Sequence, residues 1–146
     1  MPPGDPFAEV EVWDLPVRLV HWALVLLLCF QLTSAHIGGE WMRWHAWSGY
    51  TILVLVVFRI VWGFAGTTHA RFASFVTGPG AVARFLPRLA AREPLPYASH
   101  NPLAGWMIVA LLVSLLLQAG SGLFSNDGAG FEGPLASLVG VDASTE

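Results

Sequence analysis

The chain contains 146 residues, of which 55% are hydrophobic and 12% are charged, and its formal net charge is −3. Soluble domains carry roughly 25% charged residues, so this composition excludes an ordinary soluble domain and predicts a protein surrounded by lipid. All basic residues are arginines that form no broad basic face, so nucleic acid is not an expected partner.

Three stretches are long and apolar enough to cross the hydrocarbon core of a membrane, which takes about 20 helical residues. They cover residues 15–35, 44–65 and 102–124. They predict an all-α fold class, an integral membrane helical bundle with three transmembrane helices. Residues 1–14 precede this membrane domain, and residues 125–146 form an outer loop or tail.

Arginine is concentrated between the second and third stretches, whereas the tail after residue 124 has no basic residue. The basic residues of that connection are Arg71, Arg84, Arg88 and Arg92. Because positive residues are retained on the cytoplasmic side, this pattern predicts a cytoplasmic N-terminus and an outer C-terminus. The acidic residues ahead of the first stretch argue against a cleaved signal peptide.

The same connection alternates apolar and basic residues between residues 81 and 92. An apolar face beside a basic face is typical of a short helix that lies on the inner membrane surface. Pro87 in its middle disfavours a helix. A loop that only sets the topology is therefore an equal alternative.

Ionisable side chains within a span are costly, around 3 kcal/mol by insertion scales, so they usually face the bundle interior and mark function. His21, His45 and Arg59 are such residues. A helical rise of 1.5 Å per residue places the two histidines about 20 Å apart along the membrane normal, too far to bind one metal ion. The single cysteine, Cys29, excludes a zinc cluster and a c-type haem attachment, so a metal cofactor must rely on histidine.

The second stretch gathers these features on one face. At 100° per residue, the residues within roughly 40° of the line through His45 are Gly49, Ile52, Val56, Arg59 and Gly63. Gly49 leaves room for a flat macrocycle one turn from the imidazole. The pattern suits haem b, with imidazole on the iron and arginine on the propionates. Two alternatives stay open: the histidine is only a polar residue at the membrane interface, and the glycines only allow close helix packing.

The remaining histidines are weaker candidates. His36, His69 and His100 each have an interfacial or capping role as the default. His100 is followed by Asn101 and Pro102, which predict a helix start with asparagine as the N-cap and proline in the first turn. Serine and cysteine side chains lie in apolar surroundings without an adjacent base and carboxylate, so an enzyme with its own nucleophile is not expected.

Several segments resemble the bacterial cytochrome b561 and nickel-hydrogenase b-type cytochrome family. The two main ones are WDLPVRLVHW at residues 13–22 and WHAWSGY at residues 44–50. Supporting segments are RIVWGF, HARF and HNPLAG, which begin at residues 59, 69 and 100. The resemblance extends from Val12 to about Leu138.

The resemblance implies a four-helix bundle with two haem b groups, which relays electrons between quinone and a partner redox subunit or c-type cytochrome. It assigns His21 and His45 as iron ligands of different haems, and we expect Arg18 and Arg59 near propionates. The protein would then be an electron carrier without bond chemistry of its own. We expect it in the bacterial cytoplasmic membrane, with a periplasmic C-terminus, surrounded by lipid, with a homodimer among its assemblies.

The sequence departs from the family where the fourth helix, with two further ligands, is expected. No histidine follows His100. Three explanations are open: a truncated chain, a separate polypeptide that supplies the helix, or His36 or His100 as a substitute ligand. The abrupt end of the resemblance favours truncation. The alternative functions are a haem-free membrane anchor, an inactive fragment and, less favoured because no intramembrane carboxylate is present, a small proton or metal transporter.

Overall fold

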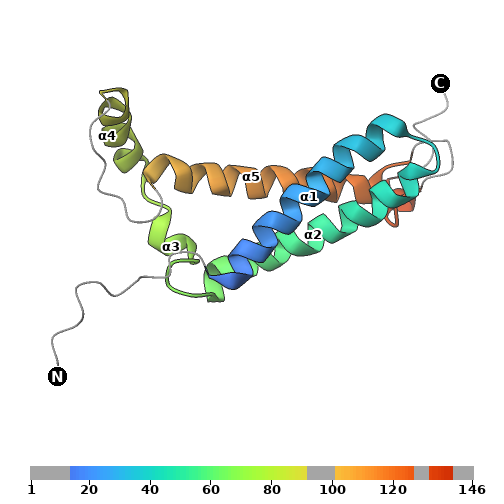
Figure 1. The fold of residues 1–146 in the computed structure, drawn as a ribbon, viewed down its shortest axis with the longest axis horizontal. Helices are drawn as coiled ribbons and strands as arrows, with labels where there is room; N and C mark the ends of the chain where they lie inside the picture. Colours follow the sequence, from blue (N-terminus) through green and yellow to red (C-terminus); the bar gives the residue numbers. More distant parts are fainter. Residues whose placement is uncertain (1–13, 92–100, 127–131, 140–146) are drawn as a thin grey trace.

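A computed structural model of the chain describes residues 14–91, 101–126 and 132–139. The described residues form helices and no strand (Figure 1). The elements are α1 (Leu15–Ile37), α2 (Trp41–Ala65), α3 (Phe72–Phe75), α4 (Pro79–Ala90), α5 (Pro102–Ser121) and two short 3-10 helices, Gly122–Phe124 and Ala136–Leu138. Three helices, α1, α2 and α5 with its 3-10 extension, are long and apolar enough to cross a membrane, which confirms the predicted all-α membrane bundle.

The first two long helices form an antiparallel hairpin. The Asp14 side chain caps α1 by accepting a hydrogen bond of 3.0 Å from the Val17 N–H. At the other end, Gly38 and Gly39 have φ angles of 67° and 57°, a region that glycine enters without steric cost. The turn continues into α2 because the Trp41 N–H donates to the Gly38 carbonyl. The second helix therefore begins at Trp41, earlier than the expected residue 44.

The central helix of the bundle is α2, which packs against both α1 and α5. In its most apolar window 28% of the residues are buried, against 6% for each of the other two long helices. Ile52 and Val56 form the core with Leu112 of α5, and leucines of α1 pack around them. Arg59 and Gly63 are also buried, so most of the face predicted for the second span points into the bundle.

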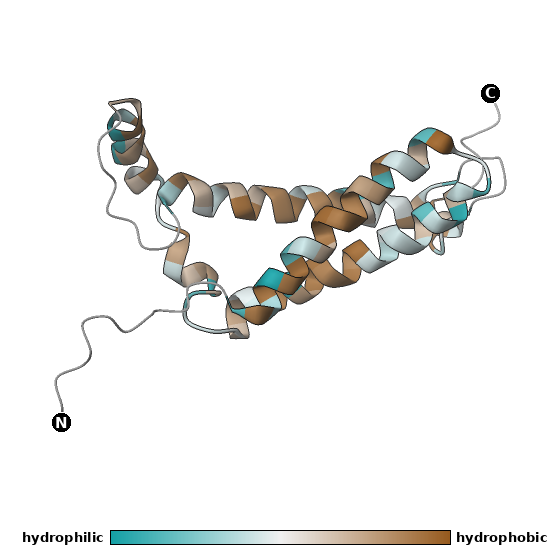
Figure 2. Cartoon of the chain, viewed as in Figure 1, coloured by the Kyte–Doolittle hydropathy of each residue, from teal (hydrophilic) through white to brown (hydrophobic). Residues whose placement is uncertain are grey.

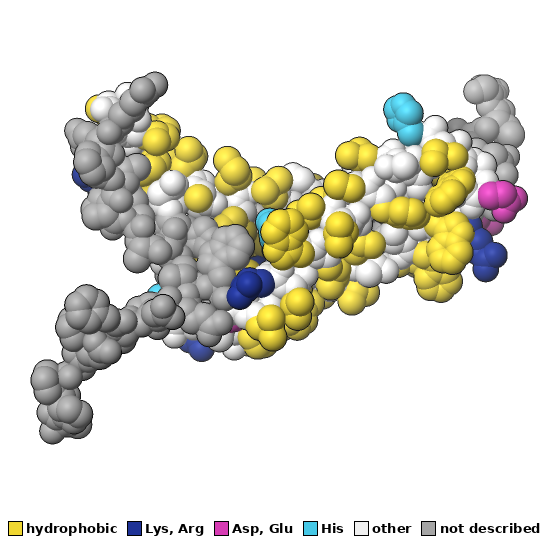
Figure 3. All heavy atoms as spheres, in the orientation of Figure 1, with side chains coloured by type: hydrophobic (Ala, Val, Ile, Leu, Met, Phe, Trp, Pro, Cys, Tyr) yellow, Lys and Arg dark blue, Asp and Glu magenta, His cyan; other side chains and the backbone are white. Residues whose placement is uncertain are grey.

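The outer surface of the bundle is apolar. Figure 2 shows hydrophobic residues along the long helices, and Figure 3 shows hydrophobic side chains spread over the visible face. Leu26, Leu32 and Phe64 are at least 70% exposed. Soluble monomers rarely expose continuous apolar patches of more than a few hundred Å². The packing therefore agrees with lipid as the surrounding medium.

The segment expected at residues 81–92 forms helix α4. Phe85 is buried in it, while Arg84 and Leu86 are exposed. Pro87 lies inside the helix without ending it, because the Ala91 N–H still donates to the Pro87 carbonyl at 2.9 Å. The contact of α4 with a membrane surface stays a prediction.

The third long helix begins at the predicted cap. Asn101 accepts a hydrogen bond of 2.8 Å from the Ala104 N–H, and Pro102 stands in the first turn, which confirms both expectations. Beyond α5, the Leu135 N–H donates to the Leu123 carbonyl at 2.9 Å. Residues 132–139 thus fold back onto the end of α5.

Candidate functional site

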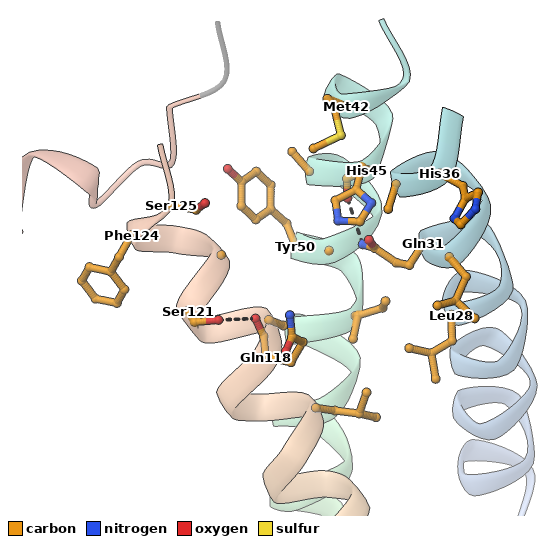
Figure 4. A pocket seen from close by; sticks show the side chains of 18 residues that line it. Leu28, Gln31, His36, Met42, His45, Tyr50, Gln118, Ser121, Phe124 and Ser125 are labelled. Atoms are coloured by element: carbon orange, nitrogen blue, oxygen red, sulfur yellow. Dashed lines mark hydrogen bonds between the residues drawn. The ribbon is translucent and has the colours of Figure 1, made fainter. Parts of the chain in front are cut away.

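A pocket of about 940 Å³ lies between the end of α1, the first half of α2 and the end of α5 (Figure 4). Its apolar lining includes Leu28, Ile52 and Leu115. Its polar lining includes Gln31, His36, His45, Tyr50 and Gln118. Pockets for cofactors and small molecules typically measure about 300–1,000 Å³ and combine an apolar wall with a few polar groups. This pocket therefore has the size and composition of a cofactor site.

His45 is half-buried on the wall of this pocket and is held by the neighbouring helix. The Ser34 hydroxyl oxygen lies 3.0 Å from its Nδ1. The side-chain amide of Gln31 donates to its backbone carbonyl at 2.9 Å, and the Ser48 hydroxyl donates to the same carbonyl at 2.9 Å. Because Nδ1 is engaged with Ser34, Nε2 is the ring nitrogen left for a ligand.

The two glycines of the α2 face meet different surroundings. Gly49 lines the pocket one turn after His45, where an added Cβ would lie 3.1 Å from the Gln31 amide nitrogen. Gly63, at the far end of α2, lies against the Phe72 ring, which an added Cβ would strike. Close packing therefore accounts for Gly63, whereas Gly49 both lines the pocket and lies against the Gln31 side chain.

The other candidate ligands lie in three different places. His36 lines the same pocket as His45, from the end of α1, and is exposed. His21 is exposed near the start of α1, outside the pocket lining, with its ring edge-to-face against Trp22 at 5.5 Å between centroids. The antiparallel hairpin therefore puts His21 and His45 toward opposite ends of the bundle. His100 lies outside the described residues.

Arg59 is buried near the end of α2, with 8% of its surface exposed. Its guanidinium carbon lies 5.3 Å from the centroid of the Phe72 ring. Its Nη1 is the one buried side-chain nitrogen or oxygen without a hydrogen-bond partner in the described part of the chain. A buried N–H without an acceptor costs free energy, so an acceptor for Nη1 would stabilise Arg59. Arg18 of α1 is exposed.

Asp14 ties the start of α1 to the end of α2, a link that the sequence did not indicate. Besides its capping bond, its carboxylate accepts hydrogen bonds from Trp62 Nε1 at 2.9 Å and Thr67 Oγ1 at 2.8 Å. Partial burial alone would raise the pKa of Asp14, but these hydrogen bonds and the nearby Arg59 hold that pKa below its usual value. The pairing joins residues 48 positions apart, so no local pattern could reveal it.

Two histidines, His36 and His45, line the pocket. The described residues contain no group of three His, Cys, Asp or Glu side chains that could hold a metal ion. The imidazole of His45 could supply one ligand to a group that brings its own metal. Sequence reasoning identified His45 and Gly49 in this wall but missed Gln31, Tyr50 and Gln118, and it missed Ser34, which contacts the His45 ring from outside the lining. Their polarity inside apolar helices was the available signal.

Comparison with known proteins agrees with the sequence motifs. Residues 12–142 match the family described as prokaryotic cytochrome b561. A probable Ni/Fe-hydrogenase B-type cytochrome subunit of Rhizobium leguminosarum bv. viciae is 31% identical, over 90% of this chain and 66% of that protein. A protein of the same name from Bradyrhizobium diazoefficiens is 27% identical, over 90% of this chain and 64% of its own length.

The chain thus spans about two thirds of the length of the curated relatives that it matches. No solved structure matches it. The family match covers most of the chain, including the described pocket residues from Leu28 to Ser125. The chain belongs to the prokaryotic cytochrome b561 family, a family of bacterial membrane b-type cytochromes.

Proposed function

We propose that this chain takes part in membrane electron transfer with haem b bound in the pocket beside His45. The observation that carries the proposal is a half-buried imidazole on the wall of an apolar pocket of about 940 Å³, in a member of a b-type cytochrome family. Haem b supplies a one-electron iron couple when it is bound. The chain supplies binding, orientation and exclusion of water, and no bond chemistry of its own.

Each part of the pocket has a distinct task in this proposal. His45 would offer Nε2 to the iron, and Gly49, which lines the pocket one turn later, would add no side chain to the wall there. Leu28, Ile52 and Leu115 keep water out, and such burial is one of the means by which a protein tunes a reduction potential. His36, on the same pocket, would be a candidate for a second iron ligand. His100 directly precedes the third long helix in the sequence, so it is instead a candidate second ligand for the haem of His21.

A second haem at the opposite end of the bundle is part of the proposal. His21 would ligate it, with Arg18 and Arg59 near its propionates. The support is the unpaired, buried Nη1 of Arg59, because a propionate is the kind of charged acceptor that such an N–H lacks. The two groups would then lie toward different membrane faces.

The proposed partners are quinone, a partner redox subunit or c-type cytochrome, and the surrounding lipid, with a homodimer as one assembly. The names of the two relatives point to a hydrogenase as the partner class. The arginines between α2 and α5 support an orientation with a cytoplasmic N-terminus and a periplasmic C-terminus in the cytoplasmic membrane.

Optical spectroscopy of the purified full-length protein tests this function. We expect a b-type reduced-minus-oxidised spectrum that develops when a water-soluble quinol is added. A dithionite control shows the total reducible haem, and the quinol should reduce a measurable fraction of it. A colourless protein that still binds a partner subunit would contradict the proposal and favour a haem-free membrane anchor.

A further inference from the structure

Ser34 is a completely buried hydroxyl near the end of α1, with 0% of its surface exposed. A buried hydroxyl is costly unless it forms hydrogen bonds. Ser34 donates to the backbone carbonyl of Gln31 at 3.2 Å, and its oxygen lies 3.0 Å from Nδ1 of His45. The side chain therefore joins the backbone of its own helix to the imidazole on the pocket wall.

The direction of the second hydrogen bond depends on which acceptor takes the single proton of Ser34. A hydroxyl has one proton to donate. Ser34 uses that proton toward the carbonyl of Gln31, in the back-bonding geometry common for serine in helices. With that proton on the Gln31 carbonyl, the Ser34 oxygen accepts from His45, so Nδ1 carries the ring proton and Nε2 carries the lone pair; a Ser34 proton directed to Nδ1 would give the opposite tautomer.

We propose that Ser34 is a positioning residue that fixes the Nδ1-protonated tautomer of His45 and so keeps Nε2 available to the haem iron. The inference rests on the proposed function, because that function supplies the haem iron. The tautomer of His45, however, can be measured in protein without haem. Metal-ligating histidines usually donate their other ring N–H to a fixed acceptor, which orients the ring and raises the basicity of the ligating nitrogen.

Gln31 strengthens the same arrangement. It stands three residues before Ser34, so both side chains lie on one face of α1. The Gln31 amide holds the backbone carbonyl of His45 at 2.9 Å, as Figure 4 shows, while Ser34 holds the ring. Backbone and imidazole of His45 are thus both attached to α1, which restricts the ring before any ligand binds.

Three substitutions separate the tautomer from general packing. Ser34→Ala removes the acceptor of the Nδ1 proton, and Ser34→Thr keeps a hydroxyl at the same place. Ser48→Ala is the matched control, because the Ser48 hydroxyl binds the backbone carbonyl of His45 and not its ring. All three are measured in the full-length protein.

The first measurement is ¹⁵N NMR of histidine-labelled protein prepared without haem. We expect the wild type, Ser34→Thr and Ser48→Ala to show His45 protonated at Nδ1, and Ser34→Ala to show a mixture of tautomers. The second measurement is the reduction potential and the affinity of haem in the haem-loaded protein. Ser34→Ala should raise its reduction potential, since a less basic ligand favours ferrous iron, and weaken haem affinity about 10- to 100-fold.

The results distinguish this inference from the function on which it rests. Protonation at Nε2 in the wild type, or a Ser34→Ala variant with the tautomer and potential of Ser48→Ala, would overturn the role of Ser34 and leave haem binding intact. A wild type that binds no haem would overturn the function, and the NMR result would still decide the tautomer. If Ser34→Ala does not fold, the wild-type spectrum alone decides it.

Discussion

Two polar side chains on one face of α2 show how single residues indicate a binding site. Nδ1 of His45 is paired with Ser34, which leaves Nε2 as the nitrogen that could bind a ligand. Arg59 has a buried Nη1 with no partner in the described residues. An unsatisfied buried N–H costs about 1–3 kcal/mol, more when the group is charged. Both residues therefore have hydrogen-bonding or ligating capacity that the described chain does not use.

Asp14 supports a prediction about acid stability. Its pKa is lowered in the folded protein, so its contribution is complete above the unfolded value of about 3.9 and is lost as the pH falls through the folded pKa. Asp14→Ala should cost about 0.5–2 kcal/mol of unfolding free energy at neutral pH through the lost cap. The substitution should also remove the part of the pH dependence of the unfolding free energy that the Asp14 carboxylate causes.

Thermal unfolding in detergent between neutral and acid pH measures both effects. Asn101→Ala is the matched control, because Asn101 caps α5 in the same way without a charge. The control should lose stability equally at all pH values. If the wild type and Asp14→Ala lose stability in parallel on acidification, the ionised carboxylate is not the cause.

At the scale of elements, the turn between α1 and α2 requires a backbone conformation that favours glycine. Gly38 has a φ of 67° and no atom within 4 Å of an added Cβ. We predict that Gly38→Ala lowers the free energy of unfolding by about 1–3 kcal/mol, the cost of a strained backbone. Gly120, inside α5, also has open space but shows no positive φ.

Gly120→Ala is therefore the control with the opposite expected sign. It should raise the free energy of unfolding by about 0.5–1 kcal/mol, because alanine is the better helix former. Reversible unfolding of both variants in the same detergent compares them directly. Equal signs for the two variants would show that backbone conformation does not govern the turn.

The helices could be predicted from sequence because their causes are local. The apolar stretches predict three long helices, and Asn101 with Pro102 predicts the start of α5. The start of α2 was misjudged because the glycine turn that begins it holds the Trp41 N–H. The inward face of α2 followed from helical periodicity, since it depends only on 100° per residue.

The contacts around the site could not be predicted in the same way. Ser34 and His45 are 11 positions apart, and Asp14 and Trp62 are 48 apart. Both pairs arise only when the Gly38–Gly39 turn brings α1 against α2. His45 was thus identified by its residue type and place in a span, whereas the residue that engages its ring required the folded hairpin.

At the scale of the molecule, the described residues combine an apolar exterior with a mostly apolar pocket near one end that also has polar lining residues. α2 lies in the centre, α1 and α5 flank it, and the pocket opens where the three helices leave space beside His45 and Gly49. The Asp14 contacts with Trp62 and Thr67 fix the other end of the hairpin. The described helices thus surround a pocket whose lining comes from α1, α2 and α5.

The central claim is that His45 binds haem b, and the haem content per polypeptide of purified His45→Ala tests it most directly. The control is His69→Ala, whose histidine is also half-buried but lies in the connection after α2, outside the pocket lining. We predict that His45→Ala loses the haem of this pocket while His69→Ala keeps the wild-type content. A His45→Ala protein with wild-type haem content and an unchanged b-type spectrum would contradict the claim.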